Sequence, residues 1–108
     1  MERIAFSDWE RLDIRIGTVT AAERVSGADK LLKLTVDLGE EARQLVAGIA
    51  LHCAPEQLVG KQVPLLANME PKKLRGLESD GMLLVAQDGA DLVLLHPERA
   101  VQNGAQMR

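Results

Sequence analysis

The stretch from Asp13 to Arg24, DIRIGTVTAAER, decides the fold class because its residues alternate with a period of two. Positions 14, 16, 18 and 20 share one face, and positions 15, 17, 19 and 21 share the other. This alternation predicts a long β-strand. Gly17 inside the strand indicates a bend or a bulge, which a small barrel needs where a strand turns a corner.

Two further strands are expected directly after this one. Residues 30–38 alternate again, with Lys33 on the outer face and four apolar side chains pointing inward: Leu32, Leu34, Val36 and Leu38. A turn at residues 39–41 then returns the chain as a third strand over residues 43–49. The first half of the chain therefore reads as a three-stranded antiparallel meander.

The second half is expected to add a short helix and two more strands. Pro55 suits the first position of a helical turn, and Gly60 suits its end. Strands are predicted over residues 61–67 and 81–87, and Pro64 implies an edge position or a missing ladder bond. Asp88-Gly89 predicts a hairpin leading into residues 92–95, and residues 68–80 read as a loop.

The chain begins with a helix signal. Ser7 and Glu10 have the spacing of a capping box, which predicts a helical turn over residues 7–11 with Phe6 stapling it to the core. The whole order is typical of an all-β, five-stranded OB-fold barrel. It carries an N-terminal helical turn, a short helix between strands three and four, and a C-terminal hairpin extension.

Bulk properties limit the class of protein. A chain of 108 residues, 46% hydrophobic and 27% charged, predicts one globular domain over residues 1–108. The N-terminus shows no targeting pattern, no apolar run is long enough for a bilayer, and Cys53 is the single cysteine. We expect a cytoplasmic protein with no membrane partner.

The residues favour binding over catalysis. His52 and Cys53 are adjacent, so their side chains diverge on a strand, and no second cysteine completes a metal set. No serine has the setting of a nucleophile elbow, and no phosphate-cradling glycine motif is present. We expect a protein that is not an enzyme, with no catalytic residue, no metal and no cofactor.

Charge is unevenly distributed along the chain. The formal net charge is −3 and the pI is about 5.3, yet residues 61–76 hold four basic side chains and one acidic side chain. Mutual repulsion within residues 68–76, NMEPKKLRG, would be offset by an anionic partner, although a solvated loop is an equal alternative. With one Phe, one Trp and no Tyr, a nucleic acid would be read by shape and phosphate more than by base stacking.

At these residues the sequence resembles the tRNA-binding domain family. That family includes stand-alone structure-specific tRNA-binding proteins, C-terminal domains of methionyl-tRNA synthetases and CsaA-type chaperones. The matching segments are 13–19, 28–34, 36–39, 43–49, 58–61, 68–76 and 78–84. The resemblance implies an OB barrel that forms a homodimer and binds tRNA.

The resemblance also implies the residues of the site. The tRNA-facing loop would be lined by Asn68, Lys72, Lys73 and Arg75. Ser79 and Met82 would lie at the binding surface, and the basic track would be extended by Lys30, Lys33 and Arg43. Because the chain begins at Met1 without a synthetase body, we expect it to act alone or to dock onto an aminoacyl-tRNA synthetase.

Departures from the family pattern keep two alternatives open. Glu70 stands where the family often has Lys, and Asp80 stands where Gln is common; both changes predict weak binding with a shallow salt dependence. One alternative is a CsaA-like chaperone dimer that binds unfolded peptides, although such sequences usually diverge from the segments 28–34 and 71–74 that this chain keeps. The other is a purely structural dimerisation module.

Overall fold

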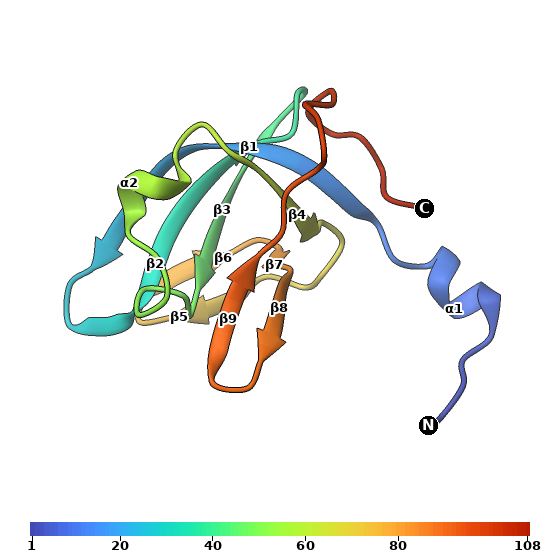
Figure 1. Ribbon diagram of the computed structural model, residues 1–108, viewed down its shortest axis with the longest axis horizontal. Helices are drawn as coiled ribbons and strands as arrows, with labels where there is room; N and C mark the ends of the chain where they lie inside the picture. Colours follow the sequence, from blue (N-terminus) through green and yellow to red (C-terminus); the bar gives the residue numbers. More distant parts are fainter.

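The computed structural model describes residues 1–108, and most of its regular structure is β-strand (Figure 1). Two short helices interrupt the strands. The elements in chain order are α1 (Phe6–Glu10), β1 (Ile14–Val25), β2 (Ala28–Asp37), β3 (Ala42–Ala47), α2 (Pro55–Leu58), β4 (Gln62–Leu66), β5 (Lys72–Leu74), β6 (Leu77–Ser79), β7 (Met82–Leu83), β8 (Val85–Asp88) and β9 (Asp91–Leu94).

Five strands form one antiparallel sheet in the order β3-β2-β1-β4-β7. The sheet curls until its edge strand β3 meets the chain leading into β7. There the backbone N–H of Asp80 donates to the carbonyl oxygen of Gln44 at 2.8 Å, and the N–H of Val46 donates to Ser79 Oγ at 3.0 Å. The predicted all-β, OB-like arrangement, with a helix between the third and fourth strands, is confirmed.

The core lies inside this curled sheet. Twelve buried residues form one cluster, and β2 contributes Leu32, Leu34 and Val36, each with no exposed area. Alternation along β2 buries these three while the residues between them stay partly exposed. The predicted inward face of the second strand is therefore confirmed.

Gly17 serves a close approach and not the predicted bulge. A Cβ built on Gly17 would lie 2.5 Å from Val36 Cγ1 and 2.7 Å from the carbonyl oxygen of Asp37. The register shifts in β1 fall instead between Val19 and Ala21 and between Arg24 and Val25. Gly17 is required because the end of β2 approaches it so closely that no side chain fits.

Pro64 lies inside the sheet and lacks a backbone N–H. No hydrogen bond between β4 and β1 is lost, because the facing residue of β1 does not offer an acceptor at this point. Its register partner is Ile16, whose N–H donates to Ala105 and whose carbonyl accepts from Gly104. The C-terminal tail, residues 103–107, thus occupies the other edge of β1 at this point. The sequence predicted an edge position or a missing ladder bond. β4 is not an edge strand, and no bond to β1 is lost, because Ile16 makes its backbone hydrogen bonds to the tail.

The N-terminal helix differs from its prediction in two respects. It begins at Phe6, its N-cap is Ala5 and no side chain caps it, so the Ser7–Glu10 capping box is not formed. Phe6 is 71% exposed and does not staple the helix to the core. Helix α1 buries none of its residues and projects from the body of the molecule (Figure 1).

The segment predicted as a loop forms a hairpin. β5 and β6 pair antiparallel, with Leu74 opposite Leu77 and Arg75-Gly76 as the two turn residues. Both turn residues have positive φ, 51° and 79°, as a tight primed turn requires. The predicted fifth strand is also divided, into β7 and β8 at Leu84, while the hairpin predicted at Asp88-Gly89 is formed by β8 and β9.

Candidate nucleic-acid interface

The β5–β6 hairpin presents the basic residues of the family motif to solvent. Lys72, Lys73 and Arg75 are all exposed, and the two lysines lie on opposite faces of β5 because they are adjacent in a strand. Glu78 is the register partner of Lys73, but no ion pair joins them. The hairpin therefore carries three positive side chains that form no ion pair, against one negative side chain, Glu78.

The tip of this hairpin meets the turn between β1 and β2. A hollow of about 430 Å³ between them is lined by Arg75 from the hairpin and by Lys30 from the start of β2, with Asp29 beside it. Lys30 is also exposed and outside every ion pair. We call Lys30, Lys72, Lys73 and Arg75 the free cations.

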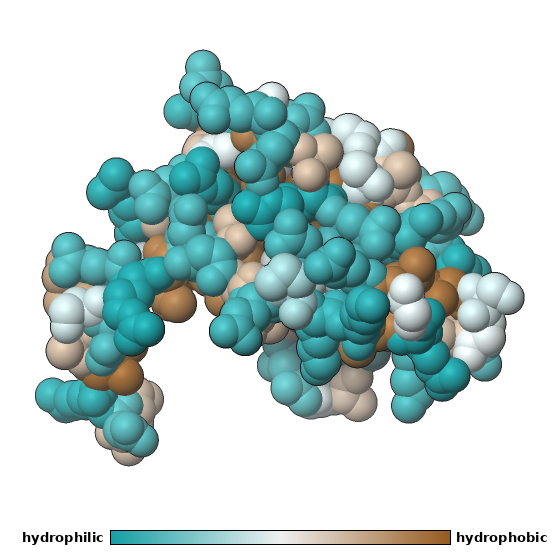
Figure 2. All heavy atoms as spheres, turned by 180° about the vertical axis from the view of Figure 1, so that it is seen from behind, coloured by the Kyte–Doolittle hydropathy of each residue, from teal (hydrophilic) through white to brown (hydrophobic).

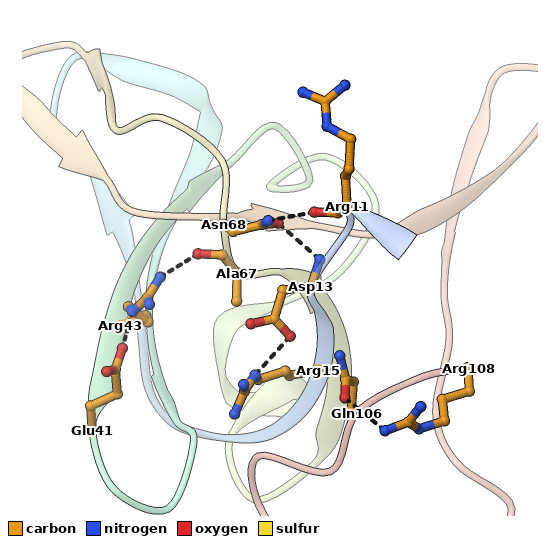
Figure 3. Close-up of polar contacts among 9 residues, drawn as sticks. All are labelled: Arg11, Asp13, Arg15, Glu41, Arg43, Ala67, Asn68, Gln106 and Arg108. Atoms are coloured by element: carbon orange, nitrogen blue, oxygen red, sulfur yellow. Dashed lines mark hydrogen bonds and ion pairs between the residues drawn. The ribbon is translucent and has the colours of Figure 1, made fainter. Parts of the chain in front are cut away.

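The other two predicted cations are bound within the fold. Lys33 Nζ lies 2.6 Å from Glu23 Oε1, its cross-strand partner on β1. Arg43 contacts Glu41, donates to the carbonyl oxygen of Ala67 at 2.7 Å, and lies 3.6 Å from Asp80 Oδ1 (Figure 3). Much of the charge of both side chains is already neutralised.

Asn68 joins the N-terminal segment to the sheet. Its Oδ1 accepts the backbone N–H of Asp13 at 2.9 Å, and its Nδ2 donates to the carbonyl oxygen of Arg11 at 2.7 Å (Figure 3). Beside it, Asp13 accepts from Arg15 Nε at 2.9 Å, and this contact raises the pKa of the Arg15 guanidinium. The amide of Asn68 has a structural task in the absence of any ligand.

Ser79 is buried, with 6% of its surface exposed. Its hydroxyl accepts from the N–H of Val46 at 3.0 Å and donates to the carbonyl oxygen of Gly81 at 3.1 Å. The first contact holds β3 against the chain entering β7, and the second lies within that chain. The resemblance implied that Ser79 lies at the binding surface, whereas the structure buries its side chain and uses its hydroxyl within the barrel.

Met82 borders an apolar groove that the sequence did not reveal. The groove measures about 340 Å³ and lies between the end of β3, the β5–β6 hairpin and the β7–β9 region. Lys72 and Glu70 stand among its lining, whose apolar side chains include Met69, Leu74, Met82, Leu83, Val85 and Leu92. The sequence held one signal for this groove. Residues of β5 alternate between its two faces, which puts Lys72 and Leu74 on the same face.

The two acidic departures lie in different surroundings. Asp80 faces Arg43, so its charge is partly compensated. Glu70 is exposed and forms no ion pair, although it lines the same groove as Lys72. Of the two, Glu70 carries the larger electrostatic cost for a nearby phosphate.

The residues considered for catalysis are engaged in local structure. His52 Nδ1 accepts the N–H of Leu92 at 3.3 Å, and the Cys53 thiol contacts the carbonyl oxygen of Ile49 at 3.6 Å. Burial raises the pKa of the Cys53 thiol. No three or more His, Cys, Asp and Glu side chains are grouped so that they could hold a metal ion.

No helix has both the length and the apolar character needed to cross a membrane.

Comparison with known sequences gives a consistent result. The model of the family described as tRNA binding domain matches residues 14–106. The methionine–tRNA ligase of Methanothrix thermoacetophila is 53% identical over 105 residues, and that of Porphyromonas gingivalis is 50% identical over 108 residues. These matches cover 97% and 99% of this chain but only 16% of each ligase.

Two solved structures share the fold over nearly the whole chain. A MetRS related protein from Pyrococcus horikoshii is 36% identical, with a TM-score of 0.95 and complete coverage of both chains. The chaperone CsaA from Bacillus anthracis is 34% identical, with a TM-score of 0.91, and the match covers 99% of this chain and all of that one.

Proposed function

We propose that this chain, which belongs to the tRNA binding domain family, binds folded tRNA through phosphate contacts and catalyses no reaction. The free cations would grip the outer shape of the tRNA. Such contacts position a protein on RNA without reading its sequence. Residues 1–108 would act as one module.

The observation that carries this proposal is the clustering of the four free cations on adjoining elements. Three are on the β5–β6 hairpin and one is at the start of β2, and these exposed side chains repel one another in the free protein. A phosphate backbone would offset that repulsion and release the counterions condensed on it. Lys33 and Arg43, by contrast, already have carboxylate partners, so we expect smaller contributions from them.

We further propose that the module acts in trans to a synthetase in the cytoplasm. The chain spans about 16% of the length of the curated methionine–tRNA ligases that it matches. Their ligase activity would belong to the rest of those proteins. A module of this kind would raise the local concentration of tRNA at an enzyme onto which it docks.

The N-terminal arm, residues 1–12, supports a homodimer. Ile4 and Phe6 are 67% and 71% exposed on the arm, and α1 buries no residue against its own barrel. Figure 2 shows apolar atoms of this arm set apart from the main body. A second copy of the chain would remove these side chains from water, which stabilises association.

Peptide binding is the second candidate function. The apolar groove beside β3 and the structural similarity to the CsaA of Bacillus anthracis favour it. The groove would take an apolar side chain of an unfolded segment. Binding an unfolded peptide does not require a cluster of positive charges, whereas binding tRNA phosphates does. The free cations therefore favour tRNA.

The deciding experiment measures binding of bulk deacylated tRNA at low and moderate salt. We compare the wild type with Lys72→Ala/Lys73→Ala/Arg75→Ala. The matched control, Lys61→Ala/Arg99→Ala/Arg108→Ala, removes the same charge from exposed positions elsewhere. We expect the hairpin variant alone to lose affinity, and its salt slope to fall by up to about three, near one for each phosphate contact.

Two results would contradict the proposal. Equal losses in both variants would mean that net charge, and not the hairpin, attracts the tRNA. No binding by the wild type at low salt would exclude the tRNA function. Binding of a denatured polypeptide in the same assay would then favour the peptide-binding alternative.

A further inference from the structure

The apolar groove lies beside the free cations, because the basic β5–β6 hairpin contributes part of its lining. Lys72 and Leu74 share one face of β5, so a cation and an apolar side chain enter the groove together. Further lining residues come from β7 and from the β8–β9 hairpin. Its volume of about 340 Å³ falls in the range of about 300–1,000 Å³ that small-molecule sites occupy.

Two exposed methionines border this groove. Met69 and Met82 are 45% and 43% exposed, although methionine side chains are usually buried. Thioethers are polarisable and adapt their shape to a flat apolar surface. The two aromatic residues of the chain, Phe6 and Trp9, are both in α1 and do not line the groove. Any flat ligand of the groove would therefore contact methionine and leucine.

We propose that the groove receives one unpaired nucleotide of the bound RNA. Its base would lie among Met69, Leu74 and Met82, and its phosphate would contact Lys72. This inference rests on the proposed function and adds a base contact to the phosphate contacts. Unstacked bases of loops and ends are the parts of RNA that proteins read most readily, because their faces and edges are free.

Glu70 gives the groove a preference among bases. A carboxylate only accepts hydrogen bonds, so Glu70 suits a base edge that carries an amino group. Adenine, cytosine and guanine offer such a group, whereas uracil offers only one ring N–H, which lies between two carbonyl oxygens that a carboxylate repels. The same residue that weakens phosphate binding would therefore select the base.

The test measures tRNA affinity by fluorescence anisotropy at three salt concentrations. We compare Met82→Ala and Met69→Ala with Met107→Ala, a matched control that is 41% exposed and outside the groove. We expect the two groove variants to bind about five- to tenfold more weakly with an unchanged salt slope. Lys72→Ala should instead lower both the affinity and the slope. Because both methionines are exposed, the variants should unfold at the wild-type temperature.

A short oligoadenylate provides the second arm. It should compete with tRNA for the wild type better than an oligouridylate of equal length, and Glu70→Gln should reduce that difference. If tRNA binds the groove variants as tightly as the wild type while Lys72→Ala binds weakly, the tRNA function stands and the base site is wrong. If the wild type binds no tRNA, both fail. If a peptide binds and Met82→Ala abolishes that binding alone, the groove belongs to the peptide.

Discussion

Ser79 is expected at the RNA-binding surface, but its hydroxyl is also used in hydrogen bonds within the barrel. Its hydroxyl is the only hydrogen-bond partner of the Val46 N–H in the structure, and both residues are buried. Ser79→Ala leaves that N–H without a partner, which costs about 1–3 kcal/mol of the free energy of unfolding. Urea denaturation should show this loss, whereas the exposed Ser26→Ala should not.

The same variant separates the two roles of Ser79. At a temperature where Ser79→Ala is fully folded, any loss of tRNA affinity reports a direct RNA contact. Unchanged affinity under that condition, together with lower stability, would assign the side chain to the fold. Equal stability of Ser79→Ala and wild type would mean that the Ser79 hydroxyl does not stabilise the barrel by accepting the Val46 N–H.

Side-chain partners are what the sequence predicted least well. Lys33 and Arg43 were placed in the basic track because they sit on strands that match the family. In the structure, however, Lys33 pairs with Glu23 across the strands, and Arg43 lies between Glu41 and the distant Asp80. Asn68 was assigned to a loop surface, and it instead holds the backbone of residues 11 and 13. Such pairings depend on register and curvature, which local residue patterns do not specify.

At the scale of elements, the C-terminal tail acts as a sixth strand along part of β1. Gly104 makes this possible, because its φ is +91° and a Cβ there would lie 2.4 Å from the carbonyl oxygen of Leu38. Gly104→Ala should therefore detach the tail and not unfold the barrel. The amide of Ile16, which donates to Ala105, should then exchange with solvent faster.

A second glycine provides the control for this prediction. Gly89 has a φ of +61° but nothing within 4 Å of a built Cβ. Gly89→Ala carries only the backbone cost of about 1–2 kcal/mol and should leave the Ile16 amide protected. Equal protection of Ile16 in both variants would contradict the proposed attachment of the tail.

Elements with one buried face were predicted well. β2 is the example, since its alternation matches its buried face; the β8–β9 hairpin, which contains no buried residue, was predicted instead from its Asp88-Gly89 turn. The β5–β6 hairpin was missed because its charged residues give no apolar alternation, and its one signal was the Arg75-Gly76 turn. The capping box at Ser7 failed because the helix starts one residue earlier. Short elements without burial carry little pattern in the sequence.

At the scale of the whole molecule, charge is divided between two ends of β2. Lys30 lies at its start beside the basic hairpin, while Glu40 and Glu41 follow its end. A net charge of −3 therefore coexists with a local positive field. Such a division orients an approaching polyanion toward one end of the barrel.

Dimer formation is the last property that the whole molecule predicts. Phe6 is the most exposed aromatic side chain, on a helix that buries none of its residues against its own barrel. Phe6→Ser should weaken a dimer by at least about tenfold, because buried aromatic anchors dominate interface energy. Sedimentation velocity across a concentration series measures this, with Val93→Ser, exposed on β9, as the control. A wild type that sediments as a monomer at every concentration would contradict the proposed dimer. An unchanged Phe6→Ser dimer would place the interface away from the arm.

If Phe6→Ser is a monomer, its affinity for tRNA tests whether the two hairpins of a dimer bind one tRNA. The monomer keeps every free cation, so we expect it to lose affinity only when both copies of the wild-type dimer contact the same tRNA molecule.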